Sequence, residues 1–225
     1  MKVQSYIGHE VRDVSGLYSI DPDGSRIGFE ARHAMVTKVH GAFHEFTGSA
    51  MLDGDDPSHS KVELVIEVAS LGTGNNRRDE HLRTNDFFDA ARYPQIRFVS
   101  TGVRRLKPSV FELTGDLTIK GNTRSISVDF EFTGAVTDPW GNHCVGFEGR
   151  TTIHRRDWGV NFNATLEAGG LLVSENVDLI LDISAVKWLE PPGAHHSGRP
   201  MDSDDEDLVV PVIPAAHHLY ASLDD

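Results

Sequence analysis

Residues 125–132 read Ser125-Ile126-Ser127-Val128-Asp129-Phe130-Glu131-Phe132, an unbroken alternation of polar and apolar side chains. Because successive side chains of a strand point to opposite faces, this pattern predicts a β-strand with one buried and one exposed face. Comparable alternating segments, each bounded by Gly, Pro, Asn or Asp, occur on both sides of this stretch, and β-prone residues begin at Gly16. They predict strands at 25–34, 41–52, 61–69, 95–103, 111–120, 124–136, 143–154 and 174–186. The chain is therefore expected to be all-β.

Short turn sequences separate several of these segments, among them 21–24 (Asp-Pro-Asp-Gly) and 120–122 (Lys-Gly-Asn). Short turns join antiparallel neighbours. A sheet with one continuous apolar face can bury that face by closing on itself. The sequence thus predicts a lipocalin-like antiparallel meander β-barrel of about eight strands.

One long connection, 70–94, departs from the alternation. Within it, Leu82, Phe87 and Phe88 stand at helical or near-helical spacing. Asp79 is a candidate N-cap for such a helix, and Pro94 is a candidate stop. We expect a short helix or turn over 79–89 that caps one end of the barrel.

Composition divides the chain into three parts. Residues 1–15 are expected to form an N-terminal arm, 16–187 a single barrel domain, and 188–225 an acidic, proline-containing C-terminal tail. The tail includes the apolar run 208–214, whose two prolines exclude a central strand.

Charge and cysteine content bear on the ligands that the protein could bind and on the compartment in which it is expected to lie. The sequence has 34 acidic and 21 basic residues, and its net charge of −13 disfavours binding to nucleic acid or anionic membranes. No long apolar run opens the chain, so we expect neither a secretory signal nor stable membrane insertion, and we expect a cytoplasmic location. The single cysteine, Cys144, cannot form an internal disulfide and fits a reducing compartment.

The inward phase of each strand supplies the candidate wall of a cavity. Its small members, Ala31, Ser100, Gly115, Gly134 and Gly149, stand where large side chains would be needed to fill a barrel. An alternative stays open, in which the glycines let strands bend at barrel corners. Beyond Gly134, the same phase places Val136 inward. The candidate lining residues are Ile27, Phe29, Ala31, Leu64, Ile66, Phe98, Leu113, Gly115, Leu117, Val128, Phe130, Phe132, Phe147, Gly149, Leu179 and Leu181.

A cavity with such walls would bind a long apolar molecule, because each buried methylene group contributes about 0.8 kcal/mol. The inward phase contains no carboxylate pair or histidine cluster, so catalysis there would lack a general acid and base. The adjacent histidines at 195–196 and 217–218 lack the spacing of a metal site. We therefore predict binding, with no catalytic residue, no metal and no cofactor other than a bound lipid.

Counting strands alternately up and down places the connections 35–40, 70–94, 121–123 and 155–173 at one end of the barrel. Cations at that end suit a phosphate-bearing head group, since a guanidinium binds phosphate through two parallel hydrogen bonds. An alternative is that these cations pair with nearby carboxylates and contact no ligand. The head-group candidates are His33, Lys38, Arg77, Arg78, Arg155 and Arg156.

Several motifs occur in order along the chain: Tyr18-x-Ile20-Asp21, Ser25-x-Ile27-x-Phe29, Gly41-x-Phe43, Asp79-x-His81-Leu82, Asp86-Phe87-Phe88-Asp89, Leu117-Thr118-Ile119-x-Gly121 and Arg155-x-Asp157-Trp158-Gly159. In this order they resemble the YceI-like family over about residues 16–187. The resemblance implies a lipocalin-like barrel, often a homodimer, whose pore holds a polyisoprenoid such as an isoprenoid quinone or a prenyl pyrophosphate. It implies binding, storage or transport of that lipid, and it does not extend to the tail from Trp188.

Two other functions compete with lipid binding. A barrel with a filled core could serve as a protein-interaction module, for example in a stress response. A barrel of this kind could also host an isoprenoid cyclase or isomerase, in which His33 would take part in the chemistry. The three functions differ in whether a cavity exists and in whether a titratable group faces it.

Overall fold

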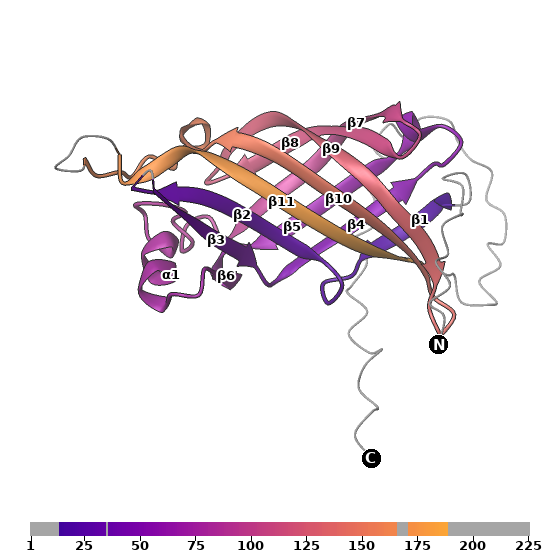
Figure 1. The fold of residues 1–225 in the computed structure, drawn as a ribbon, viewed down its shortest axis with the longest axis horizontal. Helices are drawn as coiled ribbons and strands as arrows, with labels where there is room; N and C mark the ends of the chain where they lie inside the picture. The colour runs from indigo at the N-terminus through magenta and orange to yellow at the C-terminus, as the bar shows by residue number, and fades with distance from the viewer. Residues whose placement is uncertain (1–13, 35, 166–170, 189–225) are drawn as a thin grey trace, which may run out of the picture.

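The computed structural model describes residues 14–34, 36–165 and 171–188 (Figure 1). The expected arm and tail therefore lie almost entirely outside the described residues. One α-helix occurs in the described part, α1 (Asn76–Arg83), with short 3₁₀ turns at Pro57–His59, Val68–Ser70 and Arg155–Trp158. The strands are β1 (Gly16–Ile20), β2 (Arg26–His33), β3 (Thr37–Phe43), β4 (Phe46–Leu52), β5 (Lys61–Glu67), β6 (Leu71–Gly72), β7 (Gln95–Lys107), β8 (Val110–Ile119), β9 (Asn122–Thr137), β10 (His143–His154) and β11 (Val173–Lys187).

The strands form one antiparallel sheet that closes on itself. Its order runs β1-β4-β5-β7-β8-β9-β10-β11, and β1 pairs with β11 to complete the circle. β2 pairs with β11 further along the same edge, and β3 pairs with β2. β1 with β2, and β3 with β4, therefore act as two interrupted strands of an eight-stranded barrel. The predicted all-β meander barrel is confirmed.

Two of the predicted strands, 41–52 and 95–103, have different boundaries in the structure. The segment 41–52, expected as one strand, is divided between β3 and β4, and β3 already begins at Thr37 inside the expected loop 35–40. β7 continues to Lys107, four residues past the predicted end at 103. Local alternation does not reveal these limits because the partner strands set how far each ladder extends.

The helical cap is present, but it begins earlier than predicted. α1 starts after Asn75, whose side-chain oxygen accepts a hydrogen bond from the backbone N–H of Arg78 at 3.0 Å. Asp79 is therefore not the N-cap. It is buried within the helix, where its carboxylate accepts the backbone N–H of Thr73 at 3.0 Å. Figure 1 shows α1 beside β3 and β6 at one end of the barrel, which we call the cap end.

A β-bulge reverses the predicted facing of the last part of β9. Gly146 of β10 pairs with Gly134, while Phe147 pairs with Phe132, so Thr133 is an extra residue on β9. An extra residue exchanges the two faces of a strand beyond it. Val136 is accordingly 56% exposed, and the expectation that it faces inward is wrong. Ala135 packs inside instead.

Candidate functional site

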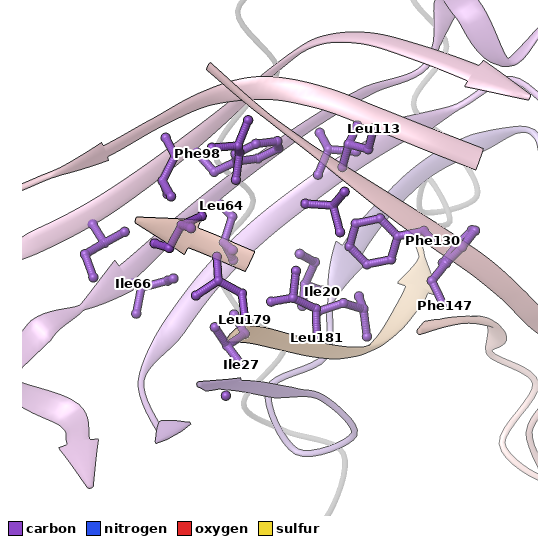
Figure 2. Close-up of a pocket in the computed structure, with 18 of the residues that line it drawn as sticks. Ile20, Ile27, Leu64, Ile66, Phe98, Leu113, Phe130, Phe147, Leu179 and Leu181 are labelled. Atoms are coloured by element: carbon purple, nitrogen blue, oxygen red, sulfur yellow. The ribbon is translucent and has the colours of Figure 1, made fainter. Parts of the chain in front are cut away.

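The barrel encloses a cavity of about 280 Å³ whose wall is almost entirely apolar. It extends from Leu82 and Phe88 at the cap end to Asp53 and Ser60 at the opposite end, which we call the far end. In Figure 2, side chains from strands around the whole barrel converge on this space, Leu64 and Leu179 among them. An apolar cavity of this kind favours a hydrocarbon over water.

Most predicted lining residues lie on the cavity wall. The exceptions are Gly115 and Gly149. The wall also includes residues outside the candidate set, among them Leu82, Phe87 and Phe88 of the cap, Trp158 and Val160 after β10, Ile20 of β1 and Val103 of β7. The predicted residues found there are Ile27, Phe29, Ala31, Leu64, Ile66, Phe98, Leu113, Leu117, Val128, Phe130, Phe132, Phe147, Leu179 and Leu181.

The two exceptional glycines have a different role from the one expected. A Cβ added at Gly149 would lie 2.5 Å from the ring of Phe130, the residue directly opposite on β9. A Cβ at Gly115 would likewise overlap the ring of Phe98. These glycines therefore accommodate aromatic rings and do not leave empty space.

This packing predicts that Gly149→Val destabilises the barrel. The new side chain would have to displace the Phe130 ring, and overpacking of this kind costs about 1–3 kcal/mol. The free energy of unfolding in urea measures the effect. Gly102→Ala is the matched control, because a Cβ there meets nothing within 4 Å, and its change should stay within about 0.5 kcal/mol. Equal stability of the two variants would contradict this role for Gly149.

Trp158 and Arg155 close the cap end. Trp158 is 3% exposed, and its indole Nε1 donates a hydrogen bond to the carbonyl of Leu117 at 2.9 Å. Arg155 is 5% exposed, and its guanidinium donates to the carbonyls of Ser174 at 2.8 Å and Val160 at 2.5 Å. Burial lowers the pKa of Arg155. The guanidinium thus joins the Arg155–Trp158 turn to the start of β11.

The other head-group candidates do not lie on the cavity wall. Lys38 bonds to Glu30 at 2.6 Å and lowers the pKa of that carboxyl. The Arg78 guanidinium donates to the Thr73 carbonyl at 2.8 Å. Near the cap end, Arg156 pairs with Glu175 at 3.0 Å, whereas the side chains of Arg77 and His33 are exposed. Of the six candidates, the cavity wall includes Arg155.

Arg105 of β7, at the far end, was not among the predicted residues. Thr101 is an extra residue on β7, so Val103 pairs with Leu113 and Arg105 pairs with Phe111. By register Arg105 shares the face of Leu113 and Phe111, which line the cavity, but its own side chain is exposed and does not line the cavity. A signal for this bulge was present in Gly102 and in the odd spacing between the apolar residues Phe98 and Val103.

Few groups on the cavity wall could act as an acid, a base or a metal ligand. Among the described residues, its ionisable groups are Asp53 and Arg155, at opposite ends. Hydrogen bonds from backbone N–H groups, the largest from Asp56, lower the pKa of Asp53. No three His, Cys, Asp or Glu side chains in the described part of the chain are grouped to hold a metal ion. None of the described residues form a helix long and apolar enough to span a membrane.

Comparisons with known proteins agree with this geometry. A model of the YceI-like domain matches residues 18–185. A UPF0312 protein of Photorhabdus laumondii is 36% identical over 172 residues, which cover 76% of this chain and 86% of the relative. The crystal structure of Burkholderia cenocepacia BcnA has a TM-score of 0.65 at 23% identity, with 73% of this chain and 98% of BcnA covered. A polyisoprenoid binding domain from Saccharophagus degradans, implicated in plant cell wall breakdown, has a TM-score of 0.57 at 15% identity, with 76% and 98% covered.

Proposed function

The chain belongs to the YceI-like family, and from that premise we propose that it binds a polyisoprenoid lipid inside its barrel and stores or transports it. The observation that carries the proposal is the apolar cavity, which extends along the barrel from the cap end to the far end. An extended hydrocarbon chain matches that shape and that wall. The polyisoprenoid binding domain from Saccharophagus degradans, which has the same fold, supports an isoprenoid as the class of chain.

The cavity can supply enough free energy for such binding. Ten buried methylene groups would contribute about 8 kcal/mol, which corresponds to a dissociation constant of about 1 μM before ordering costs are subtracted. The rings of Phe98 and Phe130, both on the cavity wall, pack over Gly115 and Gly149. A preformed wall reduces the ordering cost of binding.

The cavity also separates this proposal from its two rivals. A protein-interaction module with a filled core would contain no cavity, whereas this barrel encloses an apolar cavity of about 280 Å³. A cyclase or isomerase needs an acid or base beside its substrate, and His33, the candidate for that role, is exposed and lies off the cavity wall. We therefore propose binding without a chemical step.

Extraction of the purified protein with organic solvent tests the proposed function directly. We expect mass spectrometry of the extract to show a polyisoprenoid in a molar ratio approaching one per barrel. Protein stripped of lipid and then incubated with an isoprenoid quinone should recover that ratio. If the extract contains no lipid and the stripped protein binds neither a polyisoprenoid nor a straight-chain lipid, the proposed function is wrong.

A further inference from the structure

The outside of the barrel carries a row of apolar residues near the far end. Val136 of β9 pairs with Cys144 of β10, and Cys144 pairs with Val186 of β11. Directly paired residues of neighbouring strands share one face of a sheet. Because Val136 is exposed, all three side chains face outward.

A second row continues the first one across β1 and β4. Trp188 follows Val186 by two residues, so it lies on the same face, and it is 45% exposed. Its backbone N–H donates to the carbonyl of Leu17 at 2.8 Å, and Leu17 pairs with Met51 of β4. None of these side chains lines the cavity or belongs to a buried core cluster. We call the two rows the outer band, which consists of Leu17, Met51, Val136, Cys144, Val186 and Trp188.

The outer band can be covered only through its side chains. The strands beneath it are paired on both sides, β11 with β10 and β1, and β1 with β11 and β4. Their backbone N–H and C=O groups are used in these ladders, so an added strand would have no edge to pair with. A contiguous apolar patch on an outer face marks a contact site, whereas single exposed apolar residues do not.

The chain that follows the outer band contains a segment that matches it. The described residues end at Trp188, and the apolar run 208–214 (Leu-Val-Val-Pro-Val-Ile-Pro) follows in the tail. Its prolines disfavour a β-ladder and favour an extended conformation, in which seven residues span about 22 Å. Five neighbouring strands about 4.8 Å apart present a band about 20 Å wide. The linker 189–207 is long enough to return to the band, since each residue can span about 3.3 Å.

We propose that the apolar run 208–214 binds the outer band of its own molecule. The inference goes beyond the proposed function, because it assigns a role to the tail and needs no lipid. The linker holds the run near the band at an effective concentration of about 1 mM, so that even a weak contact is populated.

Charge favours this occupant over a second copy of the chain. Two copies would each contribute a net charge of −13. Burial and the carboxylates of Asp138 and Asp21 raise the pKa of the Cys144 thiol, so these carboxylates lie near the band and would meet their counterparts in a two-fold contact. At the opposite edge of the band, the exposed Lys61 pairs with Met51 and offers a cation to the acidic run 202–207.

The rate of alkylation of Cys144 by iodoacetamide tests the proposal on the full-length chain. Cys144 is the only cysteine of the sequence and belongs to the outer band, so its rate reports whether the band is covered. We expect Val210→Asp/Ile213→Asp to raise the rate about threefold or more, because two charges prevent the run from binding an apolar surface. Ala194→Asp/Ser197→Asp adds the same two charges to the linker and should leave the rate unchanged.

A second reporter and a dilution series distinguish the other outcomes. Ser125 is exposed on β9 outside the band, so Cys144→Ser/Ser125→Cys should react at the same rate with and without the two changes in the run. Equal acceleration at both reporters would mean that the whole barrel loosens, and the proposal would be wrong. Equal rates at Cys144 with the native and the charged run would also overturn it. Protection of Cys144 that is lost on dilution would identify a second copy as the occupant instead.

Discussion

Replacing Leu181 with tryptophan is expected to remove most of the bound lipid while leaving the barrel folded. Leu181 projects into the cavity from β11, as Figure 2 shows. An indole that takes the space of about four methylene groups would cost the ligand about 3 kcal/mol, which is a loss of about two orders of magnitude in affinity. Overpacking is ordinarily destabilising by about 1–3 kcal/mol, but here the ring enters empty volume, so the melting temperature should change little.

The neighbouring residue on the same strand provides the control. Ile180 does not line the cavity and faces the other side of the sheet. Ile180→Trp should therefore keep the lipid content and the affinity for an isoprenoid quinone, measured by extraction and by titration. A second blocking variant, Ala31→Phe, approaches the cavity from β2 and should reproduce the loss. Retention of full lipid content by both folded blocking variants would show that the ligand lies elsewhere.

Replacing Arg155 with methionine is expected to lower the free energy of unfolding by about 3 kcal/mol or more. Methionine keeps an apolar chain of similar length but has no donor for the carbonyls of Ser174 and Val160, which lose short hydrogen bonds to a charged group. An unsatisfied buried carbonyl costs about 1–3 kcal/mol, and two are left here. The urea midpoint, compared at constant slope, measures the change.

Two further variants, Arg156→Met and Arg155→Lys, test whether the loss of stability is specific to the guanidinium of Arg155. Arg156→Met removes the adjacent charge, whose ion pair with Glu175 is partly exposed, and should cost less than about 1 kcal/mol. Arg155→Lys keeps the charge, but an ammonium cannot reproduce the planar fork of a guanidinium, so its stability should be intermediate. If Arg155→Met is as stable as Arg156→Met, Arg155 does not hold the cap end together.

The sequence predicted the features that depend on local alternation. The pattern of 125–132 is sufficient for β9 and its inward face, and the same reasoning placed Leu64, Phe98 and Leu181 on the wall. It did not predict the extra residues Thr101 and Thr133, because a bulge depends on the register of the partner strand. Those two residues account for the exposed Val136 and for the missed Arg105.

The candidate site was harder to predict than the fold for a related reason. Whether Gly115 leaves space or accommodates a ring depends on where Phe98 lies on the adjacent strand, and local sequence does not encode that distance. The partners of Arg155 are backbone carbonyls, which have no sequence signature. The strand count alone therefore predicts a basic binding site for a head group at the cap end. In the structure, the guanidinium groups of Arg78 and Arg155 bind backbone carbonyls and that of Arg156 binds Glu175.

The pairing of β1 with β11 also has a consequence for how the protein is made. Ile20 pairs with Ala185, so the ladder that closes the barrel joins the first and last strands of the domain. During translation, the edge of β1 that pairs with β11 stays uncovered until β11 has left the ribosome. Contacts between residues so far apart in sequence slow folding. Until β11 is synthesised, the free edge of β1 can pair with other chains, which makes the incomplete domain prone to aggregation.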